Sequence, residues 1–197
     1  MRFILASGSA SRQRVLTAAG VPFDAIPAEL DEEGLKDKRL GDGVDLAEIA
    51  GALAGAKALQ VSHSQPDALV LGADQTLLFE TELISKCADL PAARALLSRL
   101  RGKPHRLVSA LALARGGAII WRHAAQSTLR MRDFSDVFLD RYLSTEGEGI
   151  LGCVGCYKLE GLGAQLFDWV EGDYFSILGL PLQPLLAELR RQGVIAS

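Results

Sequence analysis

The sequence predicts an α/β protein in which strands and helices alternate along one chain. Short apolar runs, such as residues 2–6 and 68–73, have the character of buried strands, and segments with helical periodicity separate them. With 197 residues and 49% hydrophobic side chains, the chain can bury a sizeable core. No linker, repeat or low-complexity tract divides it. We therefore expect one domain over residues 1–197, or two lobes that share a sheet.

The first third of the chain predicts two strands and two helices. A strand at 2–6 is followed by a helix at 11–19 that Gly20 stops, and by a short strand at 23–27. The acidic segment 29–43 is interpreted as a loop. Asp45 and Glu48 then resemble a capping box, and apolar positions on one face predict a helix to about residue 63.

The rest of the sequence, from residue 68 onward, predicts a strand-rich half that ends in a helix. Its expected elements are a strand at 68–73, a hairpin at 76–84, a helix at 91–100, two long strands at 105–115 and 118–131, a helix at 135–145, a glycine-punctuated strand-rich stretch at 152–177, and a final helix from Pro181 to Gly193. The turn between the long strands, Gly116-Gly117, is the strongest hairpin feature in the chain.

Composition limits the partners and the compartment. A formal net charge of −3 argues against a surface that coats duplex nucleic acid, and no run approaches the roughly 18 apolar residues of a membrane span. Three cysteines without a signal peptide favour a reducing, cytoplasmic location. Cys153 and Cys156 have C-x-x-C spacing, but a second pair is missing, so the alternatives are a metal or redox site and small buried residues.

Small hydroxylated residues and one guanidinium gather where the first strand gives way to the first helix. Ser7, Ser9 and Ser11 precede Arg12 at a predicted helix N-terminus, where free N–H groups and the helix dipole favour anions. Ordinary N-capping by serine explains part of this pattern equally well. Three serines and an arginine together favour a phosphate-binding corner.

Asp74 is the principal candidate for a catalytic group. It follows the apolar run 68–73 and is expected at the carboxyl end of a buried strand, where α/β proteins bind ligands. A half-buried carboxylate there suits a general base or a metal ligand. The alternative is an aspartate that only turns the chain, but the Asp74-Gln75 pair followed by apolar residues is a poor turn sequence.

Two lysines and an acidic run complete the candidate site. Lys57 falls on the inward stripe of its predicted helix, where it either extends to solvent or serves a site. Lys86 follows the expected hairpin, whose closure would bring it towards Asp74. The run Glu29 to Glu33 suits a hydrated divalent cation, although a solvated loop explains it too.

As a set, these motifs resemble the Maf family of nucleoside triphosphate pyrophosphatases. The matching segments are Leu5 to Arg12, Asp31-Glu32, Lys57, Gly72 to Gln75, Lys86, Gly161 and Gly179 to Leu182, in the family's order and approximate spacing over essentially the whole chain. The resemblance implies a Maf/ITPase-like, elongated two-lobed α/β fold with a central mixed sheet and a cleft. It also implies a divalent metal such as Mg²⁺ or Mn²⁺ and hydrolysis of modified or surplus nucleoside triphosphates to monophosphate and pyrophosphate.

The resemblance assigns roles residue by residue. Asp74 matches the proton acceptor, and Ser7, Ser9 and Arg12 match the phosphate-binding loop. Lys57 and Lys86 match substrate-binding lysines, and Glu32 matches a cleft carboxylate expected at the metal. We expect a small nucleoside triphosphate as the partner, no membrane or duplex nucleic acid, and we allow for a homodimer.

Three positions bear on which nucleotide is used. Gln75 and Glu160 resemble the subgroup that acts on 7-methyl-GTP, and a carboxylate can accept hydrogen bonds from the N1 and N2 donors of guanine. Ser11 matches neither that subgroup nor the dTTP/UTP type, and Cys87 stands where the family usually has proline. The alternatives are a dTTP/UTP pyrophosphatase and a non-catalytic nucleotide-binding regulator of septation. Rossmann and Walker fingerprints are absent from the sequence.

Overall fold

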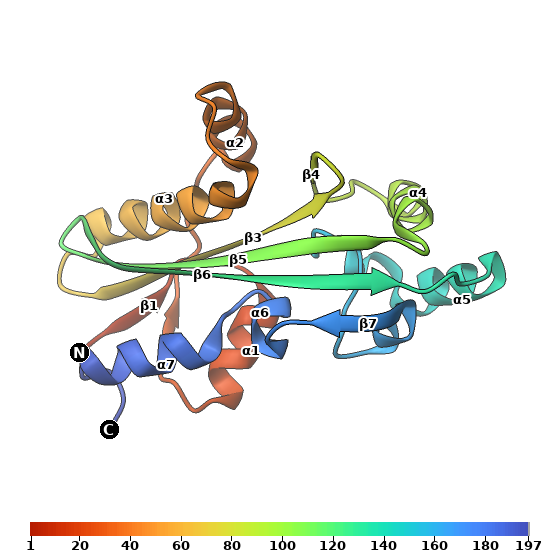
Figure 1. The fold of residues 1–197 in the computed structure, drawn as a ribbon. Helices are drawn as coiled ribbons and strands as arrows, with labels where there is room; N and C mark the ends of the chain where they lie inside the picture. The colour runs from red at the N-terminus through yellow and green to blue at the C-terminus, as the bar shows by residue number, and fades with distance from the viewer. Residues whose placement is uncertain (197) are drawn as a thin grey trace. The chain divides into compact units, whose positions relative to one another are not determined.

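The computed structural model describes residues 1–196, which form α-helices and one mixed sheet (Figure 1). Over these residues seven strands pair in the order β2-β1-β3-β5-β6-β7, and β4 pairs with β3. The strands are β1 (Phe3–Leu5), β2 (Asp24–Ala25), β3 (Leu69–Phe79), β4 (Glu82–Ile84), β5 (Pro104–Arg115), β6 (Ala118–Met131) and β7 (Phe167–Glu171). β1 is parallel to both β2 and β3, whereas β4 and β7 are antiparallel to their neighbours, so the predicted central mixed sheet is confirmed.

The described residues also form seven α-helices. They are α1 (Ala10–Ala18), α2 (Glu32–Gly41), α3 (Ile49–Ser64), α4 (Leu90–Leu100), α5 (Asp136–Glu146), α6 (Tyr174–Ile177) and α7 (Leu182–Arg191). An Asp, Ser or Pro residue precedes most of these helices. In five of them the side chain of the preceding residue accepts a hydrogen bond from a backbone N–H of the first turn. These capping residues are Ser9, Asp31, Asp89, Ser135 and Asp173.

The chain divides into two compact units. One comprises residues 1–75, 109–125 and those from 173 onward, and the other comprises residues 76–108 and 126–172. β3, β5 and β6 each contribute residues to both units. The arrangement of one domain as two lobes about a cleft stays a prediction.

The first unit is layered, with helices on both faces of β1 and β3 (Figure 1). Alternate residues of β3 point to opposite faces. Leu69, Leu71 and Ala73 pack with residues of α1 and α7, whereas Val70 packs with Val61 of α3. On the α3 face, Gly72 lies so close to the helix that a Cβ would fall 2.0 Å from the carbonyl oxygen of Ala54. This close approach requires glycine and seats α3 directly over β3.

Three sequence-based boundaries were wrong. β3 runs through Asp74 to Phe79 instead of stopping at residue 73, because an ion pair with Lys57 compensates the buried carboxylate inside the strand. The acidic segment is not a loop: residues 32–41 form α2, which Asp31 caps. Residues 152–177 hold only one strand, β7, because glycine-rich turns and a positive φ of 55° at Cys156 interrupt regular pairing.

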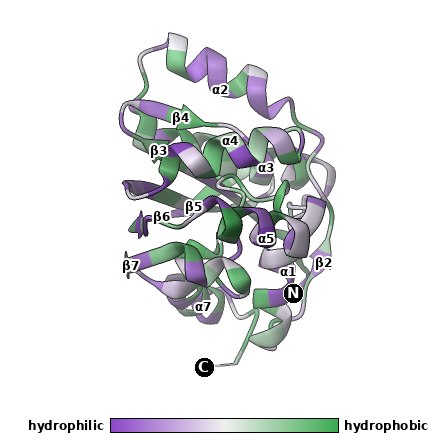
Figure 2. Cartoon of the chain, turned by 90° about the vertical axis from the view of Figure 1, so that its right-hand side faces the viewer, coloured by the Kyte–Doolittle hydropathy of each residue, from purple (hydrophilic) through white to green (hydrophobic). Residues whose placement is uncertain are grey.

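α2 escaped detection because its apolar pattern is weak. Lys36 is its one buried residue, and the helix is mostly hydrophilic in Figure 2.

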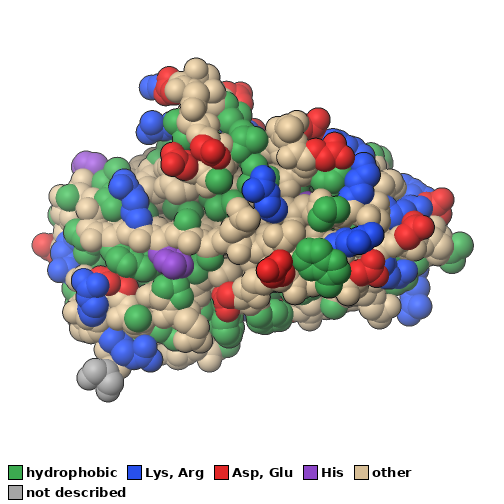
Figure 3. Space-filling view, in the orientation of Figure 1, with side chains coloured by type: hydrophobic (Ala, Val, Ile, Leu, Met, Phe, Trp, Pro, Cys, Tyr) green, Lys and Arg blue, Asp and Glu red, His purple; other side chains and the backbone are tan. Residues whose placement is uncertain are grey.

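The predicted hairpin between the two long strands is confirmed, since Gly116 and Gly117 both have positive φ and join β5 to β6. On the face shown in Figure 3, Lys and Arg side chains are interspersed with Asp and Glu. Among the described residues, none of the helices has the length and apolar character needed to cross a bilayer.

Candidate active site

Asp74 lies in the middle of β3 and is only 6% exposed. It follows Gly72 by two residues, so its side chain projects from the face of the strand that α3 covers. Ala73, which precedes it, and Leu77, three residues further on, are fully buried and project from the opposite face of the strand. The strand therefore holds a carboxylate firmly beneath a helix.

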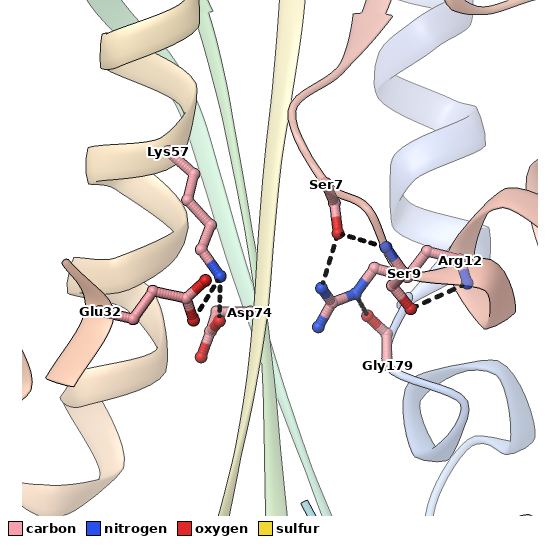
Figure 4. A network of polar contacts seen from close by, with 7 residues as sticks. All are labelled: Ser7, Ser9, Arg12, Glu32, Lys57, Asp74 and Gly179. Carbon is pink, nitrogen blue, oxygen red and sulfur yellow. Dashed lines mark hydrogen bonds and ion pairs between the residues drawn. The ribbon is translucent and has the colours of Figure 1, made fainter. Parts of the chain in front are cut away.

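Lys57 is the direct partner of Asp74. Its Nζ donates to Asp74 Oδ1 at 2.6 Å and lies 2.9 Å from an oxygen of Glu32 (Figure 4). The Lys57 and Asp74 side chains are 8% and 9% exposed, whereas that of Glu32 is 42% exposed. Lys57 therefore does not extend to solvent but pairs with two carboxylates, and its service to a functional site stays a prediction.

Helix and strand geometry bring the three charges together. Lys57 projects from α3, one residue before Ala58, which contacts Gly72. Glu32 is the first residue of α2, which Asp31 caps by accepting from the N–H of Gly34 at 3.0 Å. Two carboxylates thus converge on one ammonium, and the cluster carries a formal charge of −1.

The same two carboxylates fit a hard divalent cation in part. Mg²⁺ is commonly held by one or two carboxylates together with substrate phosphates and water. Over residues 1–196, no group of three or more His, Cys, Asp or Glu side chains is arranged to hold a metal. Glu32 and Asp74 therefore suit a cation that arrives with a phosphate ligand rather than one resident in an all-protein cage.

A second cluster lies at the end of β1. Ser9 is the N-cap of α1 and accepts the N–H of Arg12 at 3.4 Å, so the capping interpretation is correct for Ser9. Ser7 Oγ accepts from Arg12 Nη1 at 3.1 Å and from the N–H of Ser9 at 3.3 Å. The carbonyl of Gly179 accepts from Arg12 Nε at 2.9 Å. Figure 4 shows this cluster and the Lys57 cluster on either side of β3.

Arg12 is held in a buried position, with 9% of the residue exposed. Burial lowers the pKa of its guanidinium, and the negative charges of Asp74 and Glu32 act in the opposite direction. Arg12 therefore interacts electrostatically with both carboxylates without forming an ion pair with either. An anion would find at this corner a desolvated cation together with the first N–H groups of α1.

The other predicted site residues are distributed over both units. Ser11 is half-buried in the first turn of α1, and Gln75 lies beside Ser109 in the same unit. Lys86 and Glu160 are exposed and belong to the second unit, so their approach to Asp74 stays a prediction.

Two groups of this network were assigned no role from the sequence, although Gly179 begins one of the segments that resemble the family. The carbonyl of Gly179 and the hydroxyl of Ser109 have no distinctive local pattern, since any residue has a carbonyl and serine is common in strands and loops. The one available indication was the Gly179-Leu180-Pro181-Leu182 segment, which marks a break before the last helix.

Comparison with known proteins identifies the family. Residues 2–192 match the profile of the family described as Maf-like protein. The chain belongs to the Maf-like family. This confirms the resemblance inferred from the Ser7, Asp74 and Lys86 motifs.

Individual Maf-like relatives match over nearly their whole length. One from Granulibacter bethesdensis, named nucleoside triphosphate pyrophosphatase, is 49% identical over 99% of both chains. A protein of the same name from Maricaulis maris is 50% identical over 98% of both. A relative from Mesorhizobium japonicum, named 7-methyl-GTP pyrophosphatase, is 46% identical over 98% of both. These names agree with the sequence-based prediction of a hydrolase that acts on acid anhydrides.

A search of solved structures gives a weaker likeness. A nucleoside-triphosphatase, titled dITP/XTP pyrophosphatase, from Mycobacterium abscessus is 15% identical with a TM-score of 0.45, over 98% of this chain and 96% of that one.

Proposed function

We propose that this Maf-like protein hydrolyses a nucleoside triphosphate to the monophosphate and pyrophosphate, with Asp74 as the proton acceptor. The observation that carries the proposal is the buried Asp74 on β3, which Lys57 contacts at 2.6 Å. A fixed, largely desolvated carboxylate beside a cation can orient a water molecule and accept its proton. Full-length relatives named for this activity support the same reading.

In this mechanism a water molecule attacks the α-phosphorus, and the bond to the β-phosphate bridging oxygen breaks. Asp74 accepts the proton of the attacking water, and the electron pair of the broken bond leaves with pyrophosphate. Arg12 and the N–H groups of α1 bind phosphate oxygens and stabilise the charge that grows on the leaving group. Lys57 holds Asp74 in place and adds positive charge.

A divalent cation is part of the proposal. Glu32 and Asp74 would hold it, and when bound it would neutralise phosphate charge. Without this cation, only Arg12, Lys57 and Lys86 would face the tetra-anionic substrate. Arg12 already donates to the Gly179 carbonyl, and Lys57 is already paired with two carboxylates. We therefore expect the activity to depend on Mg²⁺ or Mn²⁺.

Modified purine nucleotides such as 7-methyl-GTP are the proposed substrate class. Relatives 43–46% identical carry the name 7-methyl-GTP pyrophosphatase, and Glu160 offers a carboxylate that can accept from guanine N1 and N2. The competing substrates are dTTP and UTP. The protein would serve to remove such nucleotides from the cellular pool.

The test is pyrophosphate release from GTP, 7-methyl-GTP, UTP and dTTP, with Mg²⁺, with Mn²⁺ and with EDTA. We expect release with a divalent cation, none with EDTA, and the highest kcat/KM for 7-methyl-GTP. Highest turnover of UTP or dTTP would overturn the substrate assignment alone. Absence of release from all four nucleotides, combined with measurable binding, would favour the non-catalytic nucleotide-binding alternative.

A further inference from the structure

Gln75 follows Asp74 on β3, but its side chain lies on the opposite face and is tied to the protein. Its Nε2 donates to Ser109 Oγ at 2.8 Å and to the carbonyl of Ile177 at 3.0 Å. A longer contact of 3.2 Å reaches the carbonyl of Ser176. The amide hydrogens of Gln75 are therefore engaged by the protein rather than directed to a ligand.

The carbonyl of Ser176 is the centre of this network. Besides Gln75, it accepts from Ser109 Oγ at 2.6 Å and from the N–H of Gly179 at 3.0 Å. Ser109 and Ser176 are 1% and 3% exposed. Three donors from different segments thus fix one carbonyl at the end of α6 in a buried setting, where hydrogen bonds are costly to lose.

Gly179 connects the network to Arg12. Its φ of +88° is open to glycine but strained for other residues, and its carbonyl accepts from Arg12 Nε at 2.9 Å. A Cβ on Gly179 would lie 3.4 Å from Arg12 Nε and 3.7 Å from Gln75 Oε1. Gln75 and Arg12 therefore lie against the same side of this glycine.

We propose that Gln75, with Ser109, is a positioning residue that sets the phosphate-binding orientation of Arg12 through the Ser176–Gly179 turn. The inference rests on the proposed function for its catalytic consequence. When the turn is fixed, the Gly179 carbonyl holds Nε and Ser7 holds Nη1, so the guanidinium plane is set before substrate arrives. When the turn is released, the Arg12 side chain loses its hydrogen bond to the Gly179 carbonyl and keeps the one to Ser7.

This role differs from base recognition in a measurable way. A residue that reads the base changes the ratio of kcat/KM between nucleotides. A residue that orients an arginine at the phosphates changes kcat/KM by the same factor for every base, and it also changes the binding of a phosphate chain that has no base.

The experiment compares Gln75→Met, which nearly preserves volume but removes the amide, with wild type and with Gln126→Met, the same change at an exposed position of β6. For Gln75→Met we expect kcat/KM to fall about 10- to 100-fold on GTP, 7-methyl-GTP, UTP and dTTP alike. Tripolyphosphate should bind about tenfold more weakly by calorimetry. Gln126→Met should match wild type in both measurements.

Two further measurements separate positioning from loss of structure. Ser109→Ala removes one donor to the Ser176 carbonyl and should give a smaller uniform loss, which Ser109→Thr should restore because it keeps the hydroxyl. The Nε–H resonance of Arg12 in ¹H–¹⁵N spectra, assigned with Arg12→Lys, should shift in Gln75→Met. Other arginine resonances should stay in place.

A loss confined to one base, or unchanged tripolyphosphate affinity together with an unmoved Arg12 resonance, overturns the inference. If the wild-type protein hydrolyses none of the four nucleotides, the proposed function fails. Tripolyphosphate affinity and the Arg12 resonance then still decide whether Gln75 positions Arg12.

Discussion

Lys57 Nζ lies 2.6 Å from Asp74 Oδ1, and both side chains are at most 9% exposed. The pair joins the middle of α3 to the middle of β3 at the point where Gly72 permits their close approach. Glu32 closes the group from the more exposed side, 2.9 Å from the same nitrogen. One contact therefore serves both the packing of the first unit and the proposed chemistry.

Asp74→Asn should lower kcat about 10²- to 10⁴-fold, because an amide cannot accept the proton of the attacking water. Asp67→Asn, an exposed change just before β3, is the matched control and should leave kcat unchanged. Pyrophosphate release at saturating substrate measures both. Full turnover by Asp74→Asn would remove this residue from the mechanism.

Lys57→Met should lower the free energy of unfolding by about 3 kcal/mol, because it leaves a buried carboxylate without its cation. The double variant Lys57→Met/Asp74→Leu should regain much of that stability while remaining inactive, since apolar replacement of both partners of a buried pair is often tolerated. Urea unfolding measures the stability of the variants, and the pyrophosphate assay measures their activity. An active double variant would contradict the proposed role of the pair. Lys38→Met, at an exposed position of α2, is the single-change control.

Gly72→Ala should destabilise the protein by about 1–3 kcal/mol and reduce activity, because the new Cβ would lie 2.0 Å from the Ala54 carbonyl and force α3 away from β3. Lys57 would move with the helix. Gly51→Ala on the same helix meets no atom within 4 Å and should instead be neutral or stabilising by up to about 1 kcal/mol. Thermal unfolding of the two variants tests the contrast, and equal melting temperatures would show that the close approach is unimportant.

Gly179→Ala should raise KM for every nucleotide, because a Cβ 3.4 Å from Arg12 Nε crowds the arginine. Gly193→Ala has a similar backbone strain, with φ of +70°, but open space around the new methyl group. Both variants should lose about 1–2 kcal/mol of stability from strain. An equal rise of KM in both would assign the effect to strain alone.

Acid should destabilise the second unit through His105. This side chain is 2% exposed and its Nε2 is 2.8 Å from the hydroxyl of Tyr157. Burial lowers the pKa of His105 to about 4 from the ordinary value of 6.5. Between these values the unfolded chain binds the proton and the folded chain does not, so stability falls as pH falls.

The expected contribution from His105 is about 2 kcal/mol between pH 7 and pH 5. It is measured as the difference in pH dependence of urea unfolding between wild type and His105→Gln, since other groups titrate equally in both. Parallel curves for the two proteins would show that His105 does not drive the acid sensitivity.

Periodicity and capping residues were sufficient to predict most elements. Apolar runs marked β1 and the buried part of β3, and the glycine pair placed the β5–β6 turn. These features are local, because a strand's hydrophobicity, a helix cap and a turn glycine act over a few residues. α2 was missed because a largely exposed helix needs no apolar stripe, and β3 was cut short because a charge inside a buried strand is unfavourable until its partner is known.

The sequence by itself determined the α/β class, the family and the set of candidate site residues, since these depend on residue type and spacing. The tertiary structure decided which of them meet: Lys57 bridges Asp74 and Glu32, while Gln75 faces away from Asp74 and holds the turn that anchors Arg12. The physical reason is that alternate residues of a strand point to opposite faces, and partners on each face come from segments far away in sequence. Only the folding of those segments onto β3 settles which side chains come into contact.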